Sequence, residues 1–166
     1  MIILGGDLDL DGAIVKLDES CRYLDHMRFP TCEHNATGVL KRRIDCVAMI
    51  WTLEKFLGRY DETTAFVEWP GHIMSNGMMR ISSQHRTLGN IEAALGSQGI
   101  KPMFVTVSDW KRNFGLIGKP KREAIPIANR LCGMDVKLAK DVSVAEAALI
   151  ARYGMRMLST QEAEAC

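Results

Sequence analysis

The sequence predicts a single α/β domain, in which an antiparallel hairpin system is continued by βαβ units. Its 166 residues suffice for one domain with a proper core. Its apolar content of 47% and charged content of 25% are ordinary for a soluble globular protein. Along the chain, the apolar residues change from strand-like alternation to helical spacing in the order β-β-β-α-β-α-β-α-α. This alternating order is typical of α/β folds.

The first part of the chain is predicted to form strands. The apolar run IILGG (2–6) leads into an acidic turn that ends at Gly12, and AIVKLDE (13–19) alternates, so the two runs predict a hairpin. YLDHMRF (23–29) predicts a third strand. Residues 31–42 are expected to form a loop.

Helices alternate with strands in the rest of the chain. An amphipathic helix is predicted from Asp45 to Gly58, and its apolar face suits either a core or a dimer interface. The later elements are a strand at 64–68, a helix with Leu88, Ile91 and Leu95 on one face, a strand at 102–107, a helix at 120–132 that Pro126 kinks or delays, and a helix at 142–156. Residues 1–158 would form the domain, and the tail 159–166 is expected to fray.

Composition favours a soluble, cytoplasmic protein. No apolar run is long enough to span a bilayer, and the first residues, MIILGGDLD, lack the basic and long apolar regions of a signal peptide. Five cysteines without framework spacing fit reduced thiols better than a disulfide scaffold. We therefore expect no membrane partner.

The net charge of +1 conceals an uneven distribution of charged residues. One basic cluster covers residues 41–43. The other contains Lys111, Arg112, Lys119, Lys121 and Arg122. Most acids lie elsewhere, so the sequence allows a basic surface beside an acidic pocket as well as simple solvated faces.

Three acidic residues stand at the ends of apolar segments or within them. Asp7 follows the first strand, Glu68 ends the strand 64–68, and Glu146 is embedded in the apolar helix VAEAALIA. If the first and fourth strands are parallel neighbours, Asp7 and Glu68 project from one edge of the sheet, and an overlying helix brings Glu146 to them. Taken singly, these residues could cap a turn, face water at a strand end, or pair with an arginine such as Arg152.

Together the three acids predict a metal centre. Clustered carboxylates repel one another unless a cation neutralises them. Their hard oxygen atoms suit Mg²⁺ or Mn²⁺ better than zinc. Two such ions about 4 Å apart form the clamp that hydrolyses phosphodiesters. The chemistry expected here is therefore metal-dependent phosphodiester cleavage, with no small-molecule cofactor.

Four segments resemble the motifs of RuvC-type Holliday junction resolvases. ILGGDLDLDGAIV (3–15) resembles the first motif, TAFVEWP (64–70) the second, and VAEAALIARYG (144–154) the last. VTVSDWK (105–111) is similar to the strand-plus-Trp-Lys segment of phage and prophage members. The matches occur in the family's order over nearly the whole chain.

This resemblance implies an RNase H-like fold, with a five-stranded mixed sheet flanked by helices on both faces. It implies a homodimer that resolves four-way DNA junctions by paired symmetric nicks, using two Mg²⁺ or Mn²⁺ ions per site, in a bacterial or phage-infected cell. Asp7, Glu68 and Glu146 would be catalytic metal ligands. The family carries a fourth acid or a histidine three or four residues before the last one. Because Val142 and Ser143 occupy those positions, the prediction falls on Asp141.

The resemblance also directs attention to DNA contacts. The predicted contacts are Lys111, Arg112, Lys119, Lys121 and Arg122 to phosphates, and Trp69 to a base, although a core role for Trp69 is equally open. HIMSNGMM (72–79) is expected to be a mobile loop at the junction centre. Asp9 stands where a glycine is common and is interpreted as a turn residue. Two alternatives remain open: an RNase H-like nuclease acting on RNA or flapped DNA, and a DNA-binding module with a degraded active site.

Overall fold

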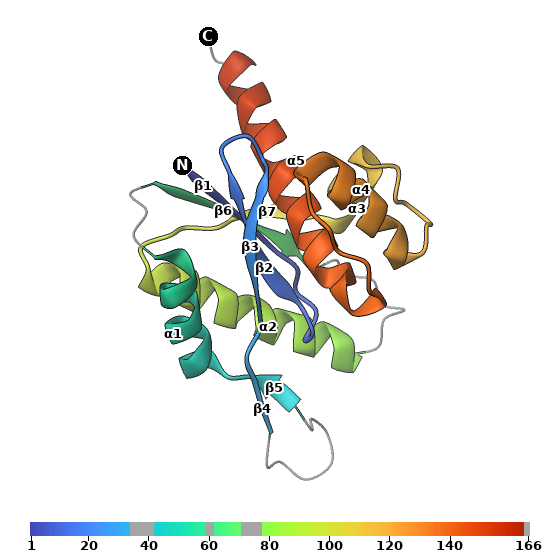
Figure 1. Cartoon of the computed structure of the whole chain (residues 1–166). Helices are drawn as coiled ribbons and strands as arrows, with labels where there is room; N and C mark the ends of the chain where they lie inside the picture. Colours follow the sequence, from blue (N-terminus) through green and yellow to red (C-terminus); the bar gives the residue numbers. More distant parts are fainter. Residues whose placement is uncertain (34–41, 59–61, 71–77, 165–166) are drawn as a thin grey trace.

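The computed structural model describes residues 1–33, 42–58, 62–70 and 78–164 of the chain (Figure 1). Its main sheet has five strands in the order β3-β2-β1-β6-β7. These strands are β1 (Ile2–Gly6), β2 (Ala13–Asp18), β3 (Tyr23–Arg28), β6 (Thr63–Trp69) and β7 (Met103–Thr106). The mixed five-stranded sheet expected from the sequence is confirmed.

The strand β1 occupies the centre of this sheet. It pairs antiparallel with β2, which pairs antiparallel with β3, so the predicted hairpin system is present. On its other side β1 pairs in parallel with β6, and β6 pairs in parallel with β7. The register places Gly6 opposite Val67. The residues that follow these two partners, Asp7 and Glu68, therefore emerge at the same edge of the sheet.

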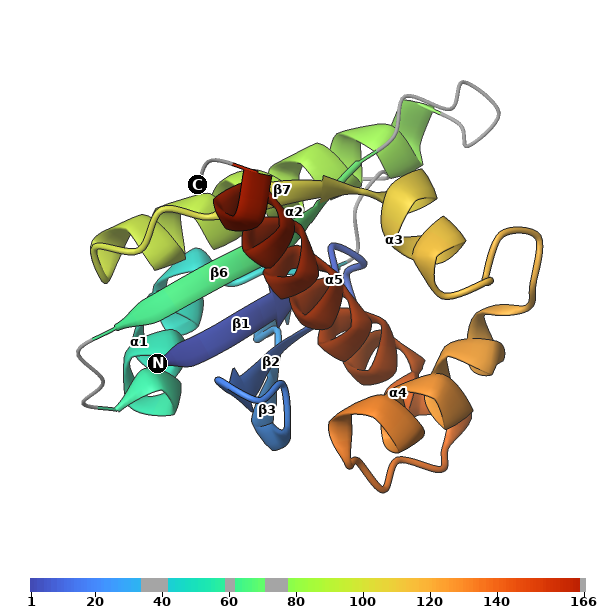
Figure 2. The same cartoon turned by 90° about the horizontal axis from the view of Figure 1, so that it is seen from above.

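Helices cover both faces of the sheet (Figure 2). The helices α1 (Cys46–Leu57) and α2 (Met78–Ser97) pack on one face, over residues such as Leu4, Ile14 and Val67. The other face carries α3 (Val107–Asn113), α4 (Ala124–Cys132) and α5 (Val142–Glu164), which pack over Ile3, Val15 and Phe66. Because side chains alternate along a strand, odd-numbered residues of β1 face α5. The apolar face of α1 belongs to the core, since Met49 and Leu53 are buried.

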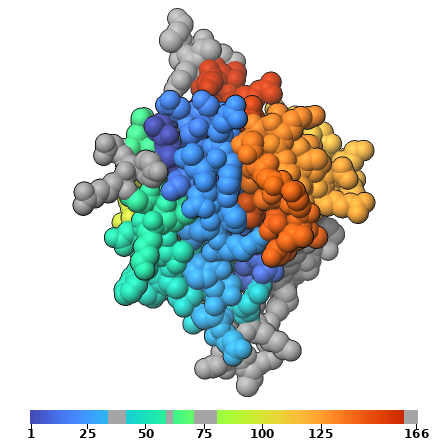
Figure 3. Space-filling model, in the orientation of Figure 1, coloured from blue at the N-terminus to red at the C-terminus, as the bar shows by residue number. Residues whose placement is uncertain are grey.

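The edge strand β3 runs down the middle of one surface, between α1 and α4 (Figure 3). Beyond β3 the chain forms β4 (Thr31–Glu33) and β5 (Arg42–Ile44), which pair with each other in a small second sheet. The predicted loop at 31–42 is thus wrong at its two ends, and its middle part, 34–41, lies outside the described residues. Strands of three residues are too short to show a period in the sequence.

Other element boundaries also differ from the predictions. Pro126 lies in the first turn of α4, where it costs no helical hydrogen bond, and a 3-10 turn (Lys121–Glu123) precedes that helix, so the late start is confirmed. The helix α5 continues to Glu164, past its predicted end at Arg156 and through most of the tail expected to fray. The helix α2 begins at Met78, inside the loop predicted at 72–79, whose residues up to 77 lie outside the described part. No helix within the described ranges is both long and apolar enough to traverse a bilayer.

The helix α5 packs against the sheet without space between them. Its residues Val144–Ala151 are all buried. A Cβ at Gly5 would lie 2.0 Å from the carbonyl oxygen of Ala147, so the bare backbone of β1 touches the helix directly. A Cβ at Gly154 would lie 2.1 Å from the ring of Phe66 on β6. Small residues thus set the depth at which α5 sits.

Replacing Gly154 by alanine tests this packing. We expect the free energy of unfolding to fall by about 1–3 kcal/mol, because the new methyl group overpacks the contact with Phe66. The matched control is Gly89→Ala in α2, where a Cβ would meet nothing within 4 Å. That substitution should stabilise the protein by about 0.5–1 kcal/mol, the ordinary helix preference for alanine. Equal effects in urea unfolding experiments would contradict the close approach of α5 to β6.

Candidate active site

Asp7 and Glu68 lie side by side at one edge of the sheet. Asp7 directly follows β1, and its backbone N–H donates to the carbonyl oxygen of Ala13 at 3.1 Å. Glu68 belongs to β6, whose register carries it beside the end of β1. Both side chains are buried, with exposed fractions of 3% for Asp7 and 8% for Glu68. By strand alternation both carboxylates point to the face that α5 covers.

The third acid, Glu146, comes from α5 and is only 3% exposed. Two lysines hold its carboxylate: Lys111 Nζ lies 3.2 Å from Oε1, and Lys121 Nζ lies 3.7 Å from Oε2. Arg152, one partner considered from the sequence, instead donates to the carbonyl oxygen of Leu131 at 2.9 Å. The protein therefore supplies cationic partners of its own for the buried Glu146.

The short helix α3 completes this arrangement. Trp110 is fully buried, and its Nε1–H donates to Glu68 Oε2 at 3.0 Å. Lys111 follows it in the chain and reaches Glu146. The sequence analysis missed this helix because the β-branched residues before it extended the predicted strand to 107. A signal was present, since Thr106 caps the helix by accepting from the N–H of Asp109, as its Thr-x-x-Asp spacing allows.

Burial and mutual repulsion raise the pKa values of two of the acids. Desolvation raises the pKa of Asp7 well above its ordinary value, and the neighbouring Glu68, Asp9 and Glu146 raise it further, whereas Lys121 lowers it. Desolvation, together with the charge of Glu146, raises the pKa of Glu68 to about 7, against the lowering effects of the Trp110 hydrogen bond and of Lys111. The pKa of Asp7 thus responds to the charges of Glu68 and Glu146, and the pKa of Glu68 to that of Glu146, so the three carboxylates lie in one cluster.

The cluster fits a hard divalent cation in its donor chemistry. Asp7 Oδ2 is buried without a hydrogen-bond partner, a costly state that a metal ligand bond would relieve. The carboxylate oxygens of three residues are the donors that Mg²⁺ and Mn²⁺ prefer. Within the described ranges, no three His, Cys, Asp or Glu side chains already stand in a metal-binding arrangement. Binding an ion would therefore require these carboxylates to adjust, Glu146 in particular, because lysines now hold both of its oxygens.

Known structures share this architecture. Neither a protein-family model nor a curated protein matches the chain. The structure of Thermus thermophilus RuvC in complex with a Holliday junction substrate matches with a TM-score of 0.65 at 13% identity, over 91% of this chain and 90% of that one. A second Thermus thermophilus RuvC structure matches with a TM-score of 0.54 at 14% identity, over 91% of each chain. The chain has the fold of RuvC. The RNase H-like fold expected from the four motifs is thereby confirmed.

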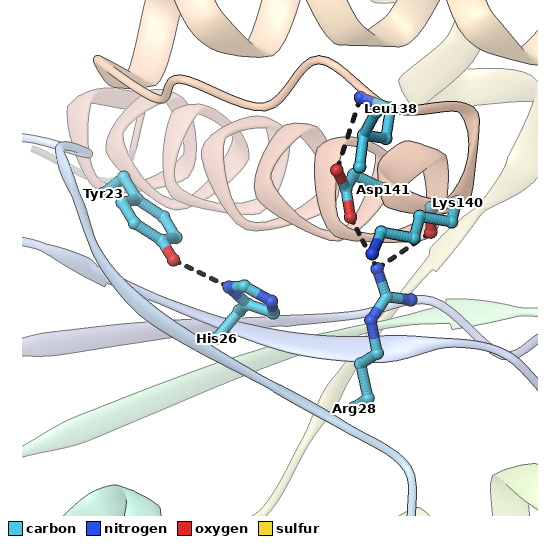
Figure 4. A network of polar contacts seen from close by, with 6 residues as sticks. All are labelled: Tyr23, His26, Arg28, Leu138, Lys140 and Asp141. Carbon is cyan, nitrogen blue, oxygen red and sulfur yellow. Dashed lines mark hydrogen bonds and ion pairs between the residues drawn. The ribbon is translucent and has the colours of Figure 1, made fainter.

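The RuvC-type motifs directed the prediction of a fourth ligand to Asp141, and the structure gives that residue other partners (Figure 4). Its Oδ1 accepts from Arg28 at 2.9 Å, and its Oδ2 accepts from the N–H of Leu138 at 3.4 Å. Arg28 also donates to the carbonyl oxygen of Lys140 at 2.8 Å. This geometry therefore joins β3 to the turn before α5 and gives no support to Asp141 as a ligand.

Asp9 is the acid that sequence reasoning undervalued. It does serve the predicted turn, because its carbonyl oxygen accepts from the N–H of Gly12 at 2.7 Å. Its side chain, however, also reaches the cluster, where Oδ2 lies 2.5 Å from Lys121 Nζ. The sequence did contain a signal for this role, because Asp9 stands at a position of the RuvC-type motif where glycine is common.

The remaining predicted DNA contacts, Arg112, Lys119, Arg122 and Trp69, lie on the protein surface. Arg112 and Arg122 are mostly exposed and pair with Asp109 at 3.1 Å and Glu123 at 3.9 Å. Lys119 is exposed next to Lys121. Trp69 is 38% exposed and makes edge-on ring contacts with Phe104 at 5.2 Å and His85 at 6.5 Å. DNA binding by these residues stays a prediction.

Proposed function

We propose that the protein is a metal-dependent endodeoxyribonuclease that resolves four-way DNA junctions by paired symmetric nicks. The observation that carries the proposal is the meeting of three buried carboxylates: Asp7 just after β1, Glu68 of β6 and Glu146 of α5. Carboxylates gathered in this way repel one another, and each charge raises the free energy of its neighbours. Such a cluster is useful when a divalent cation binds it.

In this proposal Asp7, Glu68 and Glu146 are the protein's ligands for Mg²⁺ or Mn²⁺. These residues would hold the ions, and the chemistry supplied there would be the activation of water and the stabilisation of negative charge on the leaving oxygen of a phosphodiester. The hydrogen bond from Trp110 fixes the orientation of Glu68. Lys111 and Lys121 hold two positive charges beside the centre, where an incoming phosphate would contact them.

Three features support a branched DNA substrate. The RuvC structure with a TM-score of 0.65 is itself a complex with a Holliday junction. Arg112, Lys119 and Arg122 offer cations beside the cluster for a DNA backbone. The exposed ring of Trp69, next in the chain to Glu68, offers a stacking surface for an unpaired base. Cleavage of two opposed strands needs two centres, so we propose a homodimer.

One observation favours a second candidate, a junction-binding module without nuclease activity. Val142 and Ser143 stand where a fourth ligand is expected, Asp141 is bound by Arg28, and two lysines hold Glu146. These features would also fit a site that has lost its metal. The two candidates differ in a single measurable property, cleavage.

Incubation with labelled substrates tests the proposal. We expect paired symmetric nicks in a four-way junction when Mg²⁺ or Mn²⁺ is present, and no cleavage in EDTA. A linear DNA duplex and an RNA duplex of the same sequence should remain intact, and a flapped DNA should be cleaved far more slowly than the junction. Binding of the junction without cleavage under any metal condition would favour the module. Cleavage of RNA or of flapped DNA in preference to the junction would indicate a different RNase H-like nuclease.

A further inference from the structure

We propose that Asp9 is a positioning residue that holds the ammonium group of Lys121 at the carboxylate centre. The inference rests on the proposed function, because the role given to the held cation is to contact a phosphate that enters the centre. It assigns a role to Asp9, an unusual acid of the first motif that is not among the three predicted metal ligands.

The contacts of Lys121 carry the proposal. This lysine comes from the 3-10 turn before α4, 112 residues away from Asp9 in the sequence. Its Nζ lies 2.5 Å from Asp9 Oδ2 and 3.7 Å from Glu146 Oε2, so it stands between the two acids. The shorter distance belongs to Asp9, which is therefore its main partner.

The turn that carries Asp9 is firmly anchored. Leu8, between Asp7 and Asp9, is buried in the core on the α1–α2 side. Backbone hydrogen bonds from Asp7 to Ala13 and from Gly12 to Asp9 close the turn, at 3.1 Å and 2.7 Å. Asp9 is thus held at a fixed distance from the end of β1. The side chain of Lys121 is long and flexible, so its ammonium group depends on a contact such as that with Asp9 to stay in place.

The second partner of Lys121 explains why a holder is needed. Glu146 is a proposed metal ligand, and a carboxylate that turns towards a divalent ion weakens its pairing with an ammonium group. Asp9 would then be the acid that keeps Lys121 beside the centre. Its Oδ2 already lies at hydrogen-bonding distance from Nζ, so this contact needs no rearrangement when Glu146 turns away.

Single-turnover cleavage of a four-way junction tests this role. We expect Lys121→Met to lower the cleavage rate about 100-fold, comparable to the loss of one electrostatic donor at a reacting phosphate. Asp9→Asn should lower it about tenfold, and Asp9→Glu should recover part of the loss, within the range of about 10–100-fold found for groups that orient an active-site residue. The double variant should be no slower than Lys121→Met alone, because both changes remove the same interaction. Rates that multiply in the double variant would overturn the proposal.

A matched control separates this contact from the general charge of the turn. Asp11 lies two residues further along the same turn and pairs with Arg42 instead of Lys121. Asp11→Asn removes the same charge and should leave the rate unchanged within about twofold, as for an exposed ion pair. An equal loss in Asp9→Asn and Asp11→Asn would show that only net charge matters and would overturn the proposal.

Two readouts do not depend on cleavage. Mn²⁺ binding, measured by electron paramagnetic resonance, should change less than about threefold in Asp9→Asn, whereas loss of a true ligand weakens it by about tenfold or more. Acetylation of Lys121, followed by mass spectrometry with the exposed Lys119 as internal reference, should become faster in Asp9→Asn and stay unchanged in Asp11→Asn. Tenfold weaker Mn²⁺ binding in Asp9→Asn would indicate that Asp9 is a metal ligand. Unchanged acetylation of Lys121 would show that Asp9 does not hold this lysine. Either result would overturn the proposal. If the native protein cleaves no junction, the proposed function fails, and the acetylation result still decides whether Asp9 holds Lys121.

Discussion

The substitution Glu146→Gln should lower the rate of junction cleavage by about a thousandfold while junction binding remains intact. Glutamine keeps the size of the side chain at a position that is only 3% exposed, so α5 keeps its packing. It removes the negative charge that a divalent ion requires. It also releases Lys111 from its ion pair and leaves Lys121 paired with Asp9 alone, which makes more positive charge available to DNA phosphates. The affinity for a junction should therefore be equal to that of the native protein or higher.

Cleavage and binding are measured on the same labelled junction, by denaturing gels with Mg²⁺ and by mobility shift with Ca²⁺ or EDTA. The control variant is Glu54→Gln, which changes an exposed glutamate of α1 on the opposite face of the sheet and should behave like the native protein. Cleavage by Glu146→Gln within about tenfold of the native rate would contradict the role of this residue as a metal ligand.

Without metal, the protein should lose stability as the pH rises from 5 to 8. The pKa of Glu68 is about 7 in the folded protein and near 4.5 once the chain unfolds. Between these values the folded state binds more protons than the unfolded state, so the free energy of unfolding falls with increasing pH. This difference in pKa corresponds to about 3 kcal/mol for Glu68. Asp7, whose pKa is also raised, acts in the same direction.

Urea unfolding in EDTA at pH 5, 6, 7 and 8 measures this dependence. The variant Glu68→Gln cannot ionise at this position and should have a shallower slope, with the part that is due to Asp7 remaining. Glu123→Gln, which changes an exposed acid in the same 3-10 turn as Lys121, should keep the full slope. Excess Mg²⁺ should restore stability above pH 7, because it binds the ionised carboxylates of the folded state only. A native protein with a flat profile in EDTA would show that the acids are not buried together.

The sheet and the meeting of the acids could be predicted because they follow from local patterns. Short apolar runs bounded by turn residues predicted β1 and β6, and the parallel pairing of these strands then fixed the positions of Asp7 and Glu68 in register. A one-residue shift in that register would turn Glu68 to the opposite face of the sheet, so the apolar pattern that sets the register also places the acid. Glu146 was predicted to be functional because it is an acid within an otherwise apolar helix.

The partners of these acids could not be predicted, because they depend on how far long side chains reach. Lys111 and Lys121 lie in separate segments after β7, and nothing in their spacing shows that both ammonium groups converge on Glu146. The same holds for Asp141. It was predicted as a ligand because it is the nearest acid before Glu146. Its partner Arg28 lies on β3, 113 residues away in the sequence, and no pattern in the sequence links the two. Charged side chains choose partners in space, and a linear pattern records only neighbours along the chain.

The complete burial of Val144–Ala151 also determines how the centre moves. Amide protons in such a segment exchange with solvent only when the whole domain opens, so α5 should be among the slowest-exchanging parts of the molecule. The backbone that carries Glu146 therefore keeps its position, and only the side chain can turn. Under the proposed function, a DNA strand must be brought to this fixed site, and any bending that accompanies binding occurs in the DNA or in the segments around α5.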